Sequence, residues 1–285
     1  MTRSSRIRLL LLATLGTACT APPVDATLTR ADRADGQWVW SAADAARFAE
    51  GRRALPALVP GVWVATVAFD RGGVTQRLAL APSTVRDGPI VAVVRFDDAF
   101  HAAWDAMDDA TLARAVGARM TALVAALGAV PGASPNVRVA EVQLDYDCPE
   151  RRLARWATLV RALGHGPLAG RPLWITSIPA HVRHDDYGAL FRGVVAGHVV
   201  QVFDTGDRFT PASLGALAAD LDARALPFRF GVGAFERETA VGRTTHRAWF
   251  AAAPRLAASR WYRGTWVFPA GASWLAYREP MTASR

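Results

Sequence analysis

The stretch VAEVQLDYDCPE, from Val139 to Glu150, alternates like a β-strand but keeps one face polar. One face carries Val142, Leu144 and Tyr146, and the other carries Glu141, Gln143, Asp145 and Asp147. Because successive side chains of a strand point to opposite sides of a sheet, the two sets are separated in space. Such a strand suits a barrel, in which the apolar face packs against helices and the polar face points into the interior.

Similar β-rich apolar segments recur along the chain, most of them bounded by Gly, Pro or Asp. They are Gln37–Ser41, Val59–Asp70, Pro89–Asp98, Val137–Asp147, Pro172–Pro179, His198–Thr205, Pro227–Phe235 and Arg263–Ala270. Helical patterns lie between them at Asp108–Gly128, Pro149–Gly164 and Thr210–Leu226, with weaker ones at 41–55 and 242–258, whereas 71–82 has the pattern of a hairpin return. The alternation predicts a single α/β domain, a (β/α)8 TIM-type barrel that is irregular around its first two strands. An open doubly wound sheet is the alternative.

The first residues have the pattern of an export signal. A short basic region precedes an apolar run that ends in small residues, so residues 1–18 are expected to be a signal peptide. Cys19 follows directly and is the expected site of lipidation, although Gly16 departs from the usual lipoprotein signal and simple cleavage is the alternative. Residues 19–36 are polar and aperiodic, which predicts a flexible tether, and residues 37–285 form the barrel domain. The protein is therefore expected to be exported, either to the periplasm or as a lipoprotein anchored to the outer membrane through Cys19.

Composition excludes several classes of protein. The net charge is +8, but the chain has no lysine and its arginines are spread among acidic residues, so we expect no nucleic-acid partner. With only two cysteines, one of them the expected lipidation site, a disulfide framework and cysteine-ligated zinc are both excluded. No glycine-rich nucleotide loop follows the first strand. The sequence therefore predicts no cofactor.

The same face rule brings polar groups from other strands into the interior. It assigns Arg95 and Asp97, Thr176, and Gln201 to the inside, next to Glu141, Gln143 and Asp145. One interpretation is a buried ion network, with Arg95 paired to Glu141 or Asp145. The other is a ligand pocket at the carboxyl ends of the strands, where barrel enzymes keep their chemistry. For that pocket we expect a substrate-binding set of Arg95, Asp97, Gln143, Gln201, Trp40, Thr176 and Trp266.

The motif QLDYDCPERRLARW, followed by the strands LWITSIPA and VVQV, resembles a family of exported bacterial proteins catalogued as domain of unknown function 3142. The resemblance covers roughly residues 38–266 and implies a barrel of the glycoside hydrolase type. A looser similarity joins this strand to the chitinase-like hydrolases, whose D-x-x-D-x-D-x-E pattern Asp145 and Asp147 match at the two central aspartates. Pro149 stands where that pattern has its glutamate, and Glu150 comes one residue later.

The favoured hypothesis is acid–base hydrolysis of a cell-envelope or extracellular glycan, with Asp147 as the acid and Asp145 positioning it or assisting the substrate. Two carboxylates two residues apart on a strand repel when both are ionised, so one pKa should be raised. Glu236 or Asp204 could supply a further carboxylate. The alternative is a barrel that binds a glycan or an envelope protein without turning it over.

Metal binding is a minor option. Asp97, Asp145 and Asp147 could hold Ca²⁺ or Mg²⁺ through oxygen ligands. HVRHDD, residues 181–186, contains two histidines, His181 and His184, which are expected to be exposed loop residues. No metal site is predicted.

Overall fold

A computed structural model describes residues 35–85, 87–128, 137–203, 205, 210–239, 242–245 and 247–269. The expected signal peptide, Cys19 and nearly all of the expected tether lie outside these residues, as does Asp204. The barrel begins slightly earlier than expected, because Asp35 already donates its backbone N–H to the Thr265 carbonyl at 2.7 Å and Gly36 opens the first strand.

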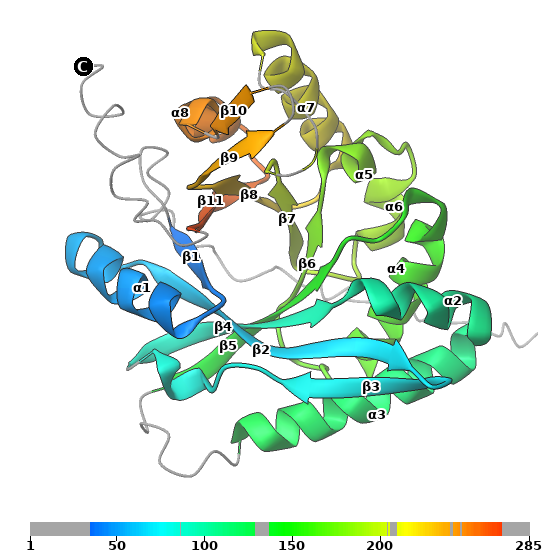
Figure 1. The fold of residues 1–285 in the computed structure, drawn as a ribbon. Coiled ribbons are helices and arrows are strands. Elements are labelled where there is room, and N and C mark those ends of the chain that lie inside the picture. Colours follow the sequence, from blue (N-terminus) through cyan, green and yellow to red (C-terminus); the bar gives the residue numbers. More distant parts are fainter. Residues whose placement is uncertain are drawn as a thin grey trace, which may run out of the picture.

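The described chain folds as a closed barrel of eight parallel strands surrounded by helices (Figure 1). The barrel strands are β1 (Gly36–Val39), β2 (Val59–Asp70), β4 (Gly88–Phe96), β5 (Val137–Tyr146), β6 (Leu173–Ser177), β7 (Gly197–Gln201), β8 (Phe228–Gly233) and β11 (Tyr262–Phe268). Each pairs with the next in this order, and β1 closes the ring by pairing with both β2 and β11. The predicted (β/α)8 barrel is confirmed.

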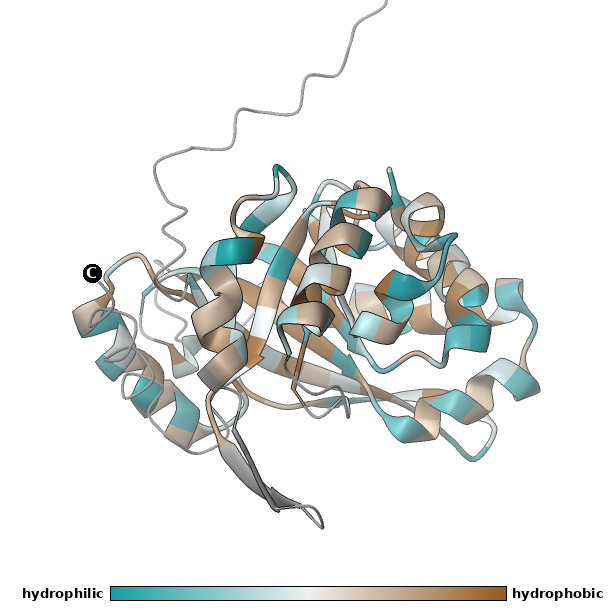
Figure 2. Cartoon of the chain, turned by 90° about the horizontal axis from the view of Figure 1, so that it is seen from above, coloured by the Kyte–Doolittle hydropathy of each residue, from teal (hydrophilic) through white to brown (hydrophobic). Residues whose placement is uncertain are grey.

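The helices follow the strands around the outside of the barrel. They are α1 (Ala42–Ala54), α2 (Ala103–Ala106), α3 (Asp109–Gly128), α4 (Leu153–His165), α5 (Pro179–Arg183), α6 (Tyr187–Phe191), α7 (Pro211–Arg224) and α8 (Arg247–Leu256), with 3₁₀ turns at η1 (Pro82–Thr84), η2 (Asp98–Ala102) and η3 (Glu150–Arg152). Figure 2 shows hydrophilic and hydrophobic segments alternating along these helices, as expected for elements with one buried face. On α4 the predicted stripe of Leu153, Trp156, Leu159, Val160 and Leu163 is buried.

The barrel is irregular where the sequence predicts it to be. No α-helix separates β2 from β4 among the described residues; instead β2 turns back into the antiparallel strand β3 (Gly73–Leu78). The turn places Arg71 and Gly72 at φ +48° and +78°, the positive angles that a tight two-residue hairpin requires. The predicted helix over 242–258 is only partly correct, because β9 (Glu236–Thr239) and β10 (Gly242–Thr245) form a hairpin and α8 starts at Arg247.

Two apolar layers hold the barrel together. The outer layer lies between strands and helices and contains Val142, Leu144 and Tyr146, as the face rule predicts. The inner layer fills the barrel with Trp38, Val91, Val93, Trp174, Val199 and Trp266. The indoles fit because glycines face them: a Cβ on Gly61 would lie 2.6 Å from Trp266, and one on Gly197 would lie 2.5 Å from Trp174. The large indole side chains of some strands thus fill the space that glycines, which have no side chain, leave on other strands.

Candidate functional site

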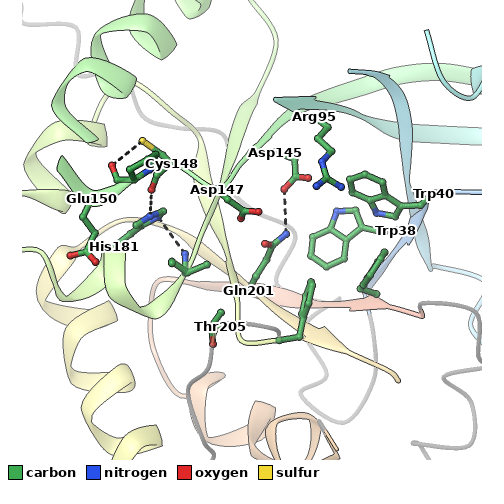
Figure 3. Close-up of a pocket in the computed structure, with 14 residues that line it drawn as sticks. Trp38, Trp40, Arg95, Asp145, Asp147, Cys148, Glu150, His181, Gln201 and Thr205 are labelled. Carbon is green, nitrogen blue, oxygen red and sulfur yellow. Dashed lines mark hydrogen bonds between the residues drawn. The ribbon is translucent and has the colours of Figure 1, made fainter. Parts of the chain in front are cut away.

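A pocket of about 620 Å³ opens among the loops that follow the carboxyl ends of the strands (Figure 3). Its lining comes from β1, β4, β5, β7 and β11 and from the loops after β5, β6 and β7: Trp38, Trp40, Arg95, Asp145, Asp147, Cys148, Pro149, Glu150, Ile178, His181, Gln201, Phe203, Thr205 and Phe268. The pocket therefore has an acidic side, formed by the end of β5, and an aromatic side, formed by β1, β7 and β11 (Figure 3).

Asp145 is the buried carboxylate of the pocket. It is 9% exposed, and its Oδ1 accepts a hydrogen bond from the Gln201 side-chain amide at 3.4 Å. Burial, reinforced by the charge of Asp147, raises the pKa of Asp145 to about 6, against the opposing effects of Arg95 and of hydrogen bonds from Thr176 and Gln201. This carboxyl group is therefore half protonated at about pH 6.

Asp147 is the exposed carboxylate of the pair. It follows the last residue of β5, and the backbone turns immediately afterwards, where Cys148 donates its N–H to the Tyr146 carbonyl at 2.8 Å. Pro149 then leads into η3, whose first residue, Glu150, is also exposed and also lines the pocket. The position at which the chitinase-like pattern has a glutamate is thus occupied by the proline, while a third carboxylate lies one residue further along.

His181, in the short helix α5, joins the start of that helix to the loop after β5. The Ile178 backbone N–H donates to its Nδ1 at 3.4 Å, so the proton of the neutral ring is on Nε2, which donates to the Cys148 carbonyl at 2.7 Å. Burial lowers the pKa of His181 below its usual 6.5 and favours this neutral form. The prediction that His181 is an exposed loop residue is wrong, because His181 is buried in α5 and both of its ring nitrogens form hydrogen bonds; His184 is exposed as predicted.

The aromatic side is a continuous set of rings. Phe203 and Phe268 stack at 5.4 Å between centroids with an angle of 19°, Phe268 meets the edge of Trp40 at 5.9 Å, and Trp40 packs on Trp63 at 5.1 Å. Trp40, Phe203 and Phe268 are only half-buried. Rings held in this way present fixed apolar faces, which suit the flat C–H face of a sugar.

The expected substrate-binding residues fall into three positions relative to the pocket. Arg95, Gln201 and Trp40 line the pocket together with both aspartates. Gln143, Thr176 and Trp266 are 0%, 3% and 2% exposed and lie beneath it in the barrel interior. Asp97 lies outside the lining, at the start of η2, with a buried Oδ1 that has no partner among the described residues. A position at the end of a strand therefore does not by itself identify a residue that lines the pocket.

The expected pairing of Arg95 with Glu141 is wrong. Glu141 binds Arg229 of β8 instead, with two hydrogen bonds of 2.7 and 3.0 Å, because both lie near the amino-terminal end of the barrel. Arg229 also stacks on Trp174, with its guanidinium carbon 3.7 Å from the ring centroid. The alternative neighbour of Arg95, Asp145, does lie beside it in the strand register.

Several pocket residues carry no sequence signal that pointed to them. Phe268 ends a strand whose apolar character indicates core, and Ile178 and His181 lie at the start of the short helix α5. Phe203, two residues after β7, does have a signal, because the period of two places it on the inner face with Gln201. Glu236, a candidate carboxylate, has a side chain outside the described part of the structure. Within the described residues no group of three or more His, Cys, Asp or Glu side chains is arranged to hold a metal ion.

Comparison with known proteins finds similarity in fold. No protein-family model matches the chain, and no curated protein sequence matches it. The spore cortex-lytic enzyme SleL of Bacillus cereus superposes with a TM-score of 0.55 at 11% identity, covering 86% of this chain and 74% of that one. A chitinase of Rhizomucor miehei gives 0.52 at 10% identity, covering 78% of this chain and 92% of that one.

A xylanase and α-amylase inhibitor protein of Scadoxus multiflorus gives a TM-score of 0.53 at 12% identity, covering 89% of this chain and 99% of that one. Identities this low establish the barrel fold that these proteins share with the chain. The three similar structures include both enzymes and an inhibitor, so the fold alone does not fix an activity.

Proposed function

We propose that the pocket binds a glycan and hydrolyses one of its glycosidic bonds, with Asp145 and Asp147 as the reacting carboxylates. The observation that supports this most is the pair itself: a buried aspartate with a pKa of about 6 next to an exposed aspartate, in a pocket with an aromatic side. Acid–base hydrolysis of a glycoside needs one carboxyl group that carries a proton and one that is ionised.

The burial of Asp145 favours it as the acid, which reverses the roles expected from the sequence. In this scheme Asp145 donates its proton to the glycosidic oxygen as the C–O bond breaks. Asp147 either removes a proton from the attacking water or attacks the anomeric carbon itself, and water completes the reaction. Gln201 holds the Oδ1 of Asp145 in place. Trp40 and Phe268 would carry the sugar on the opposite side.

A second candidate function is glycan binding without turnover. It is favoured by Pro149, which occupies the position of the glutamate in the chitinase-like pattern. An inhibitor protein with the same barrel fold shows that the fold also occurs outside enzymes. The two candidates share the pocket and differ only in whether Asp145 transfers its proton.

A panel of peptidoglycan, chitin and exopolysaccharide fragments tests both functions. Hydrolysis by the wild type, with Asp145→Asn and Asp147→Asn each lowering the rate at least about 100-fold while binding persists, is the result expected for general acid–base chemistry. Asp98→Asn, exposed and outside the pocket lining, is the control. Binding without product, unchanged in either pocket variant, would leave only the binding function. Proton NMR of the first product would assign Asp147 as nucleophile if configuration is retained or as base if it is inverted.

We further propose that the protein is exported and anchored through a lipid on Cys19. The support is the sequence pattern of residues 1–19. We expect the wild type to incorporate labelled palmitate and to be found in the membrane fraction. Cys19→Ala should incorporate none and should be found in the soluble fraction. Equal labelling of the two forms would contradict this proposal.

A further inference from the structure

We infer that Arg95 is a recognition site for a carboxylate on the glycan, so that the substrate class is an acidic polysaccharide such as one built from uronic acids. The inference rests on the proposed function and makes it more specific. It depends on how Arg95 is held in the pocket and on the absence of a hydrogen-bond or ion-pair partner for it among the described residues.

Arg95 reaches the pocket with no hydrogen-bond or ion-pair partner among the residues that the structure describes. It is half-buried at the end of β4, it lines the pocket, and its guanidinium lies between Asp145 and the ring of Trp40 (Figure 3). Within the described residues the guanidinium makes no hydrogen bond and no ion pair; its one specific contact is with Trp40, whose ring centroid lies 5.4 Å from the Arg95 Cζ. The donors of Arg95 are therefore available to a ligand.

A second arginine of the barrel, Arg229, has a structural role and serves as a comparison for Arg95. Arg229 is bound by both oxygens of Glu141 and lies against Trp174 at 3.7 Å. Its charge is neutralised within the protein. Arg95 has a longer aromatic contact, and no carboxylate of the described residues forms an ion pair with it; its strand neighbour Asp145 accepts hydrogen bonds from Gln201 and Thr176. A ligand carboxylate would supply the missing partner.

The chemistry of the guanidinium matches a carboxylate. Its planar set of N–H donors binds the two oxygens of a carboxylate in parallel, and the contact with the Trp40 ring holds the guanidinium within the pocket. Charge also favours a singly charged group. Asp147 and Glu150 already place negative charge on the same pocket, so a doubly charged phosphate ester would be repelled more strongly than a singly charged carboxylate.

The register places this recognition close to the reacting bond. Arg95 and Asp145 are direct partners across β4 and β5, and neighbouring strands lie about 4.8 Å apart. A carboxylate bound to Arg95 would therefore belong to the sugar at the reacting carboxylates or to its neighbour. Recognition at this point selects the sugar that is cleaved and not only the polymer that is bound.

Calorimetry with a matched pair of ligands tests the inference. The probes are a tetramer of galacturonic acid and its carboxyl-reduced neutral counterpart, with a phosphate-bearing neutral tetrasaccharide as a third arm. We expect the wild type to bind the acidic tetramer about tenfold or more tightly than the neutral one. Arg95→Gln should lose this preference and still bind the neutral tetramer, and Arg95→Lys should keep only part of it. Arg71→Gln, 94% exposed on the β2–β3 turn, is the control.

Each outcome is decisive. Equal binding of the acidic and neutral tetramers, or a preference that survives Arg95→Gln in a variant shown to be folded by its thermal unfolding, would overturn the inference while leaving the glycan function in place. Tighter binding of the phosphate-bearing probe would overturn the assignment to a carboxylate. Failure to bind any glycan, together with failure on the wider panel, would overturn the proposed function itself.

Discussion

The Nε2 of His181 lies 2.7 Å from the carbonyl oxygen of Cys148, and this hydrogen bond joins α5, which follows β6, to the residue next to Asp147. His181 is 2% exposed, so both groups are shielded from water. The backbone next to Asp147 is therefore held by a side chain of α5, the helix that follows the neighbouring strand β6. In a catalytic pocket this kind of support keeps a reacting group at its position.

His181→Ala should destabilise the protein and lower glycan turnover. The substitution leaves the Cys148 carbonyl and the Ile178 N–H buried without a partner, at a cost of about 1–3 kcal/mol in the free energy of unfolding. Urea denaturation and turnover assays measure the two effects. His184→Ala, three residues later and exposed, should change the free energy of unfolding by less than about 0.5 kcal/mol. Equal stability of the two variants would show that the bond does not hold the loop.

Asp145→Asn should stabilise the protein at pH 8. The pKa of Asp145 is about 6 in the folded state and 3.8 for the free side chain, so ionisation is harder in the fold than in the unfolded chain. The stability that this carboxyl group contributes is present below pH 3.8 and is lost as the pH rises through about 6. The loss is at most about 3 kcal/mol, and the asparagine avoids it.

Chemical denaturation at pH 8 and pH 4 measures this effect. We expect Asp145→Asn to exceed the wild type by about 1–3 kcal/mol at pH 8 and by little at pH 4, where the wild-type carboxyl group is mostly protonated. Asp70→Asn, at an exposed position of the β2–β3 hairpin, should show no such dependence. A gain that is the same at both pH values would contradict the raised pKa.

Gly61→Ala should destabilise the barrel because its interior has no room for a methyl group. The new Cβ would lie 2.6 Å from the Trp266 ring and 3.0 Å from Trp38. We expect a loss of about 1–3 kcal/mol in thermal or urea unfolding. Gly117→Ala on α3 is the matched change, since nothing lies within 4 Å of its Cβ and a helical alanine should add about 0.5–1 kcal/mol. Similar effects at the two glycines would mean that the barrel core repacks freely.

Arg229 and Glu141 should be energetically coupled. They are 12% and 23% exposed, and each is the other's charged partner. Removing one, as in Arg229→Met, leaves the other charge partly buried and should cost about 3 kcal/mol. The double variant Arg229→Met with Glu141→Gln should cost less than the two single costs added together, by about 1–3 kcal/mol in a double-mutant cycle. Additive costs would indicate that solvent already screens the pair.

The pocket could be found from the sequence only in part. The face rule placed four polar residues at the ends of β4, β5 and β7, and these residues do meet in the pocket: Arg95, Asp145, Asp147 and Gln201. Gln143 and Trp266 do not reach it, because they sit at a lower level of the barrel, where the interior is filled. Strand pattern gives the face of a residue but not its height along the barrel axis, which is set by the stagger of the strands on closure.

What the sequence determined by itself was local. A period of two residues sorted β5 into an outer face of Val142, Leu144 and Tyr146 and an inner face with Asp145, and the alternation of strands and helices specified the barrel. Only the tertiary structure decided the partners: Glu141 with Arg229, His181 with Cys148, and Arg95 with the Trp40 ring. Periodicity follows from the geometry of a single strand, whereas partners depend on which distant strands and loops become neighbours when the barrel closes.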